Sequence, residues 1–258
     1  MIKFFRQIRK KLIEQSKIRS YLFYAIGEIV LVVIGILIAL QINNWNEDRK
    51  ISIQEYNALN NIYRDFLKNK EILKEVSSST SIVLESGVQT LNHTGNKVKP
   101  DSESIFNNWL NNLFYNKPYY PQNGFLDDLL SSGKLGIFKN VELRNLLSSW
   151  KPDVEILEER FNTVKTSENI LNAYIIEKAS WLNADQADSK TRNVTFPISG
   201  FTVDNRDLLK ELQFENLLEN VLILTDTYYS TQQKTEKLLD DIIALLETEI
   251  NKTNDKTL

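Results

Sequence analysis

The amino-acid sequence predicts an all-α protein, in which one N-terminal transmembrane helix is followed by an elongated extracytoplasmic helical bundle of three long and two short helices. Two observations carry this prediction. Gly and Pro are scarce, with 8 and 5 in 258 residues, whereas ordinary proteins carry roughly 12% of the two together. So few turn-forming residues allow only a handful of loops and disfavour a many-stranded sheet. In addition, one uninterrupted apolar run lies near the N-terminus.

The apolar run covers residues 21–42 and reads YLFYAIGEIVLVVIGILIALQI. As a helix it would extend about 33 Å, enough to cross a hydrocarbon core of about 30 Å. A secretory signal peptide should end in a small-x-small cleavage site, and the exit through Ala39, Leu40 and Gln41 lacks that pattern. A buried helix of a soluble protein is the alternative. Basic residues before the run and Trp45 after it favour a retained membrane anchor.

Basic residues are unequally distributed around this span. The first twenty residues contain seven Lys or Arg and one Glu, whereas the twenty after the span contain only Arg49 and Lys50. The positive-inside rule therefore predicts that residues 1–20 are a cytoplasmic juxtamembrane segment. Residues 43–250 are then a single bundle domain outside the cytoplasm, and residues 251–258 a frayed tail. Since the chain as a whole has a net charge of −3, the outer part is acidic and should repel nucleic acid.

One face of the span is a candidate contact with another membrane helix. Gly27, Gly35 and Ala39 lie at spacings of four or eight, and Gly35 and Ala39 form a small-xxx-small pair that lets two backbones approach. Glu28 lies inside the span, where an ionised side chain is costly unless it finds water or a partner. It either marks the helix contact or a proton-linked site, or it reaches the headgroups or is protonated. Self-association and pairing with another membrane protein both remain open.

Three stretches of the chain resemble a known family. The run YAIGEIVLVVIGILIALQINNWNE (residues 24–47) is similar to the N-terminal signature of a bacterial family of uncharacterised single-pass membrane proteins, a domain of unknown function. The resemblance extends to LLSSGKLGIFKNVELRNLLSSW (residues 129–150) and to residues 214–218. It implies a bacterial inner-membrane protein with a periplasmic body. It brings no activity, cofactor or catalytic residue.

After the span, apolar residues recur at threes, fours and sevens from Leu59 to Leu91, which predicts one helix, or two in line, ending near His93. Asp101 or Ser102 should cap a first short helix. Two prolines and a glycine make residues 115–124 a loop. A second short helix follows from residue 125 and should end at Gly133.

The remaining elements complete the bundle. Asn140 should cap a long helix that continues to Trp181, with a kink or a restart at Pro152. Residues 183–203 are polar and should be the least ordered stretch. Asp204 or Asn205 should open the last helix, which carries an apolar stripe to residue 250. Because each helix is amphipathic, packing against one another is the economical way to bury their stripes.

Motifs for chemistry are sparse. The chain has no Cys and one His, which excludes disulfides, thiolate nucleophiles and two-His metal sites. No glycine-rich phosphate-binding motif is present. The acidic doublets at 127–128, 158–159 and 240–241 lack the Glu-x-x-His partner of helical di-metal sites and are typical of solvated helix faces. We therefore expect no catalytic residue, metal or cofactor, and His93 should be an exposed bystander.

An aromatic cluster in the predicted loop is the second candidate site. Tyr115, Tyr119, Tyr120 and Phe125 lie in a Pro-containing segment. Such aromatics can dock a partner or stack on a ligand. Alternatively, they pack the end of the bundle beneath the loop.

Two functions remain. The first is a membrane-tethered interaction, scaffold or sensory module, whose partners are the lipid bilayer and a protein, or a second copy of the chain, bound through the span. The second is a carboxylate-based enzyme of unfamiliar type, which would require acidic groups converging in a deep pocket with raised pKa values.

Overall fold

The computed structural model describes residues 7, 10, 18–185, 194 and 196–257. Most of the basic segment 1–20, and residues 186–193 of the stretch expected to be least ordered, lie outside that part. The described residues contain helices and no strand, which confirms the all-α prediction. The three long helices are α2 (Ile18–Leu91), α5 (Val141–Lys178) and α7 (Leu212–Thr257). The shorter elements are α3 (Glu103–Asn112), α4 (Gly124–Ser131), α6 (Trp181–Asp185) and the 3-10 helices η1 (Lys134–Ile137) and η3 (Asn205–Lys210).

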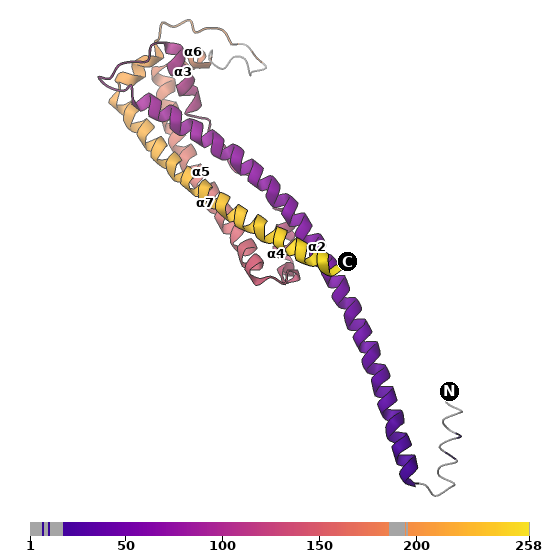
Figure 1. Ribbon diagram of the computed structural model, residues 1–258. Helices are drawn as coiled ribbons and strands as arrows, with labels where there is room; N and C mark the ends of the chain where they lie inside the picture. Colours follow the sequence, from indigo (N-terminus) through magenta and orange to yellow (C-terminus); the bar gives the residue numbers. More distant parts are fainter. Residues whose placement is uncertain (1–6, 8–9, 11–17, 186–193, 195, 258) are drawn as a thin grey trace.

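Helix α2 runs without a break for 74 residues, about 110 Å at 1.5 Å per residue. No described side chain between Leu22 and Gln54 is buried, and Glu55 is the first that is. Figure 1 shows this first part as a spur that projects far beyond the bundle. By its length and composition the spur is a candidate membrane span. The single continuous helix joins that span to the body.

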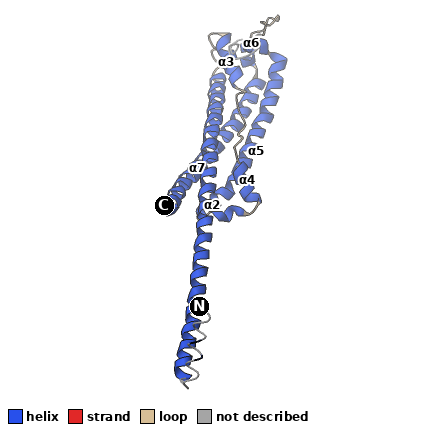
Figure 2. Ribbon diagram, turned by 90° about the vertical axis from the view of Figure 1, so that its right-hand side faces the viewer, coloured by secondary structure: helices blue, strands red, loops and turns tan. Residues whose placement is uncertain are grey.

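Helix α7 is the central element of the bundle, because it packs against both α2 and α5. Its C-terminal end lies level with the place where α2 leaves the bundle (Figures 1 and 2). The apolar stripes form two separate cores. The proximal core, near the spur, joins α2, α4, α5 and α7. The distal core joins α3, α5, α6, η3 and α7, with Leu84 and Leu91 of α2 packed against it.

Polar side chains separate the two cores. In this polar layer the buried residues come from α2, the loop after α3, α5 and α7: Ser79, Thr80, Ser86, Asn116, Ser167, Glu168, Thr225 and Gln232. Gln232 Nε2 donates to Thr80 Oγ1 at 2.9 Å, and Asn112 Nδ2 donates to Ser86 Oγ at 3.0 Å. Gln232 Oε1 has no hydrogen-bond partner in the described part of the chain. Such a layer contributes less apolar burial to the bundle than the two cores do.

Several predicted helix ends are confirmed. Ser102 caps α3 by accepting from Ile105 N, and Asn140 caps α5 by accepting from Leu143 N at 3.1 Å. Gly133 has a φ of 67° after α4, the left-handed conformation that favours glycine.

Other boundaries differ from the prediction. Helix α5 ends at Lys178, because Ala179 is extended and the next amide, Ser180 N, donates to Asn205 Oδ1 at 2.8 Å. Trp181 therefore belongs to α6. The same helix runs through Pro152 without a restart. Pro152 has no N–H to donate to the carbonyl of Ser148, four residues earlier. Because both residues are exposed, water can bind that carbonyl instead.

The start and end of the last helix also differ. Asp204 caps the 3-10 helix η3 by accepting from Arg206 N, and α7 begins only at Leu212. Leu209 O accepts from Gly95 N at 2.7 Å, a contact that ties η3 to the end of α2. At the other end, α7 extends to Thr257, so residues 252–257 of the segment expected to fray are helical, and residue 258 lies outside the described residues.

Candidate functional site

The predicted membrane contact lies on the free spur of α2. Gly27, Gly35 and Ala39 are exposed there, and Glu28 is half-buried. A Cβ atom built on Gly27 or Gly35 would meet no described atom within 4 Å. The spacing of four thus places small residues on a helix surface that the described part of the chain leaves open.

The predicted aromatic loop is an extended strap rather than a cap over the end of the bundle. Residues 115–123, here called the strap, connect α3 at the distal end with α4 at the proximal end and contain no helix. Along the way the strap contacts α5 through Asn116, α7 through Lys117 and α2 through Tyr119. It therefore fills the groove between α2 and α5 and serves as a fourth, non-helical wall of the bundle.

Buried side chains of the helices hold the strap backbone. Asn69 is fully buried on α2; its Nδ2 donates to Gln122 O at 3.1 Å and its Oδ1 accepts from Gln122 N at 2.6 Å. Trp150 Nε1 on α5 donates to Asn123 Oδ1 at 2.8 Å. Tyr228 on α7 donates to Lys117 O at 3.0 Å, and burial raises the pKa of its hydroxyl to about 12. The three helices thus provide hydrogen-bond partners for backbone and side-chain groups of a segment that has no secondary structure of its own.

The distal part of the strap meets a buried carboxylate. Asn116 Nδ2 donates to Glu168 Oε1 at 2.9 Å and to Thr225 Oγ1 at 3.3 Å. Lys165 Nζ lies 3.0 Å from Glu168 Oε2. Asn116 Oδ1 has no hydrogen-bond partner in the described part of the chain. This contact belongs to the polar layer between the two cores.

The strap separates the four aromatic residues into two groups. Tyr119 is 5% exposed, and its ring packs edge-on against Trp150 with centroids 6.4 Å apart. Phe125 packs against the proximal core. Tyr120 and Tyr115, by contrast, are 72% and 47% exposed. Tyr119 and Phe125 therefore serve packing, and only Tyr115 and Tyr120 are available to a partner.

A hollow of about 480 Å³ lies between α2 and α3, with Tyr115 at its strap side; we call it the α2–α3 pocket. Its lining is almost entirely uncharged: Ile82, Glu85, Ser86, Gln89, Asn108, Trp109, Asn111, Asn112 and Tyr115. The Trp109 ring stacks on His93, with centroids 5.3 Å apart and planes 19° apart. His93, expected to be an exposed bystander, is therefore half-buried and supports the wall of this pocket.

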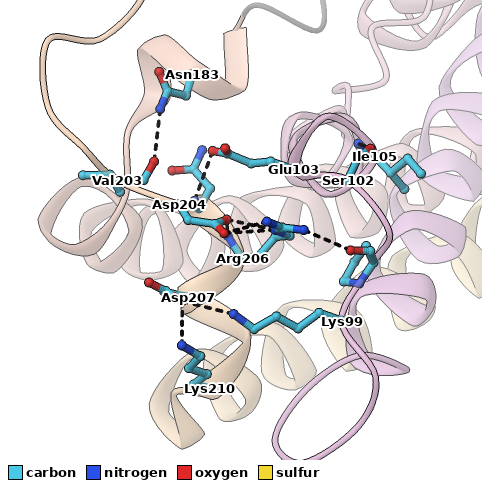
Figure 3. Close-up of polar contacts among 12 residues, drawn as sticks. Lys99, Ser102, Glu103, Ile105, Asn183, Val203, Asp204, Arg206, Asp207 and Lys210 are labelled. Carbon is cyan, nitrogen blue, oxygen red and sulfur yellow. Dashed lines mark hydrogen bonds and ion pairs between the residues drawn. The ribbon is translucent and has the colours of Figure 1, made fainter.

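A polar network closes the distal end of the bundle (Figure 3). Asp204 receives hydrogen bonds from Arg206 Nε and Nη2 at 3.0 and 2.8 Å, and Arg206 Nη1 donates to Pro100 O at 3.3 Å. The hydrogen bond from Arg206 holds the pKa of Asp204 below its ordinary value. Asp207 lies between Lys99 and Lys210, at 3.1 and 2.8 Å.

We call this network, formed by residues 99–107, 180 and 204–210, the distal cap. Asn205 is its buried centre. Its Nδ2 donates to Asn107 Oδ1 at 2.8 Å and to Ser180 O at 3.0 Å, while its Oδ1 accepts from Ser180 N. Its backbone N donates to Glu103 Oε1 at 3.2 Å. The cap therefore joins α3, α6 and η3, three segments that are distant in sequence.

Comparison with known proteins assigns the chain to a family. Residues 28–226 match a family of unknown function (DUF6090). The chain belongs to this family. Searches of the curated proteins and of the solved structures find no match.

The DUF6090 match extends from Glu28 in the spur to Asp226 in α7. It therefore includes Gly35 and Ala39, the strap, the α2–α3 pocket and the distal cap. A shared family of unknown function assigns no chemistry to any of these four features.

The acidic doublets lie on surface helices of this DUF6090 protein. Glu158 and Glu159 line a shallow hollow on α5, and Asp127 and Asp128 line another beside Lys151. Burial raises the pKa of Asp65 and of Asp153, which belong to different helices, α2 and α5. In the described part of the chain no three His, Cys, Asp or Glu side chains are placed to hold a metal ion.

Sequence reasoning missed the residues that organise the strap and the pocket. Asn69 and Trp109 lie on the amphipathic helices α2 and α3, and for Asn69 a polar residue on the apolar face is the available signal. Asn69 lies seven residues after Ile62 and four before Leu73, on the buried stripe of α2. A buried amide at such a position needs a partner from outside its own helix.

Proposed function

We propose that the protein is a single-pass protein of the bacterial inner membrane, with its N-terminus in the cytoplasm and its helical body in the periplasm. We propose further that the body is an interaction, scaffold or sensory module. The observation that carries the proposal is the continuity of α2 from the candidate span to the distal end of the bundle. A rigid helix shared by anchor and body can transmit a displacement from one to the other.

The packing of α2 supports a transmitting role. Residues 55–90 of α2 contribute to both cores and to the polar layer, so a partner bound to the body would act directly on the helix that forms the span. The α2–α7 contact is tight at Gly87, where an added Cβ would lie 2.2 Å from Leu222 Cδ2. At the polar layer the same pair of helices is held by the hydrogen bond from Gln232 to Thr80, and a single hydrogen bond permits small shifts at lower cost than interlocked apolar side chains do.

Two surfaces are candidates for partner binding. Tyr120 and Tyr115 on the strap present rings that are 72% and 47% exposed, and aromatic residues are enriched at binding hot spots. In the bilayer, the open face of Gly27, Gly35 and Ala39 suits close packing against a second transmembrane helix. The proposal assigns no catalytic step, metal or cofactor to the chain.

Topology can be tested with reporter fusions. A reporter that is active only in the periplasm, fused after Leu258, should be active, and one that is active only in the cytoplasm should be silent. Activity of the cytoplasmic fusion would refute the proposed orientation.

Partner binding can be tested by photo-crosslinking in cells. A photoreactive phenylalanine in place of Tyr120 should yield a discrete adduct in the membrane fraction. The matched control carries the same group at Ile156, an exposed apolar residue on α5. The same adducts from both positions, or none from Tyr120, would count against the strap as a docking surface.

A further inference from the structure

The α2–α3 pocket has the size of a small-ligand site and a mostly polar lining that includes two aromatic rings. Its volume of about 480 Å³ lies within the roughly 300–1,000 Å³ of typical ligand pockets. Two aromatic side chains, Trp109 and Tyr115, share the lining with the amides of Gln89, Asn108 and Asn112. Broad apolar rings and groups that both donate and accept hydrogen bonds therefore face one space.

Parts of this lining are held in place before any ligand binds. The Trp109 ring is held by its stack on His93, and His93 Nδ1 is hydrogen-bonded to Val98 O. Asn112 Nδ2 donates to Ser86 Oγ at 3.0 Å. That bond fixes the amide and leaves Asn112 Oδ1 as an acceptor without a partner in the described part of the chain. Such preorganisation lowers the entropic cost of binding.

The charges around the pocket select against ionic ligands. Glu85 is the one charged residue in the lining, and its carboxylate would repel an anion. Lys117 Nζ lies 5.8 Å from the centroid of the Tyr115 ring, so a cationic ligand at that ring would meet a positive charge already in place. A neutral ligand avoids both penalties.

We propose that the α2–α3 pocket binds a neutral oligosaccharide. A sugar ring has apolar C–H faces that pack on aromatic rings, as Trp109 and Tyr115 offer. Its hydroxyl groups donate and accept, which matches the amides of Asn108, Asn112 and Gln89, and the Glu85 carboxylate can accept from two of them. Free oligosaccharides and the glycan strands of a cell wall share this chemistry.

This inference rests on the proposed function in one respect, because a periplasmic body would meet cell-wall glycans. Binding in detergent solution does not depend on topology. Failure of sugar binding would therefore leave the topology and crosslinking results intact, and the reverse holds as well.

The first arm of the test measures binding of soluble sugars to the full-length chain in detergent micelles. Calorimetric titration with the β-1,4-linked tetramers of N-acetylglucosamine and of glucose should give saturable binding for at least one of them. Tyr115→Ala and Asn108→Ala, which both alter exposed side chains, should each raise the Kd about five- to tenfold through the lost stacking or hydrogen bond. Asn162→Ala, an exposed amide on α5 outside the pocket, is the matched control and should leave the Kd unchanged.

The second arm uses purified peptidoglycan sacculi, with the same variants assayed by co-sedimentation. Binding to sacculi without binding to the tetramers assigns the pocket to the polymeric glycan, provided that Tyr115→Ala reduces it. Circular dichroism must show that each variant keeps the native helix content. Absence of saturable binding in both arms, or equal binding by wild type and both pocket variants, would overturn the proposal.

Discussion

The side chain of Asn69 and the backbone of Gln122 pair in both directions, with Asn69 Nδ2 donating to Gln122 O and Asn69 Oδ1 accepting from Gln122 N. The Asn69 side-chain amide thus makes the same pair of N–H and C=O hydrogen bonds to Gln122 that a neighbouring β-strand would make. Asn69 lies on the buried stripe of α2, and Gln122 lies on the strap. The pair therefore fixes the position along α2 at which the strap crosses the proximal core.

Asn69→Leu should therefore destabilise the fold by about 1–3 kcal/mol, because the backbone amide and carbonyl of Gln122 both lose their partner on α2. Urea unfolding of the full-length chain in detergent measures the change. Asn162→Ala, an exposed amide on α5, is the control and should cost less than about 0.5 kcal/mol. Equal costs for the two variants would show that the strap is held in some other way.

For the polar layer we predict the opposite effect of apolar substitutions on stability. Gln232 leaves Oε1 without a partner in the described part of the chain while Nε2 bonds Thr80. Replacing both partners by apolar residues of similar shape, Thr80→Val with Gln232→Leu, should leave stability unchanged or raise it by about 1–2 kcal/mol. Gln232→Leu alone should do less, since the Thr80 hydroxyl then loses the donor from Gln232 and keeps only its bond to Val76 O. Thermal melts of the three variants and the wild type compare them.

Gly87→Ala tests the close approach of α2 and α7. Alanine has the better helix propensity by about 1 kcal/mol, but its Cβ would overlap the Leu222 side chain, and overpacking typically costs about 1–3 kcal/mol. We expect a net loss of stability in the single variant. In a double-mutant cycle with Leu222→Ala, the alanine at position 87 should become stabilising, because the overlap is gone. A Gly87→Ala effect that does not depend on Leu222 would contradict the contact.

The distal cap should lose stability in acid. Because the folded pKa of Asp204 lies below its ordinary value of 3.8, the carboxylate stabilises the fold fully above that value. The contribution is lost as the pH falls through the lowered folded pKa. Asp204→Asn should therefore be less stable than wild type at pH 7, and the difference should shrink below about pH 3.8. Unfolding curves at several pH values test this, and a gap that does not change with pH would exclude the ionic contribution.

Gly35→Leu tests the membrane face. If Gly35 and Ala39 pack against a second helix, the leucine should weaken association by roughly 1 kcal/mol or more without affecting insertion. Ile34→Leu is the control, since residue 34 points away from that face at 100° per residue. A membrane two-hybrid assay reports association. Equal signals from wild type and Gly35→Leu would leave the span as an anchor only.

Helix positions could be predicted from residue patterns within each helix. Contacts between segments that are distant in sequence could not. Ser102, Asn140 and Gly133 mark helix ends by interactions within four residues, so sequence alone placed them. The end of α5 depends instead on Asn205, which lies 25 residues beyond Ser180. Nothing in the local sequence of residues 115–124 distinguishes the buried Tyr119 from the exposed Tyr120, because the helices facing each side of the strap decide which ring is covered.

The site predictions divide in the same way. The small residues Gly35 and Ala39 could be identified from spacing alone, whereas the α2–α3 pocket arises only when Gln89 and Trp109, twenty residues apart, come together on two helices. The role of His93 depends on the same encounter, since its ring is covered by Trp109. Interactions across the fold, rather than periodicity within one helix, create both features.

Because α2 is one unbroken helix, a change in the tilt of its N-terminal part would displace its distal end. From Asn43 to Leu91 the helix extends about 70 Å, so a tilt change of about 10° in the bilayer would move its distal end sideways by about 12 Å. Transmembrane helices tilt when bilayer thickness and span length differ. Lipid composition would then set where the body stands above the membrane. The lateral position of the distal cap over the membrane would thus vary with the bilayer, although no bond in the body changes.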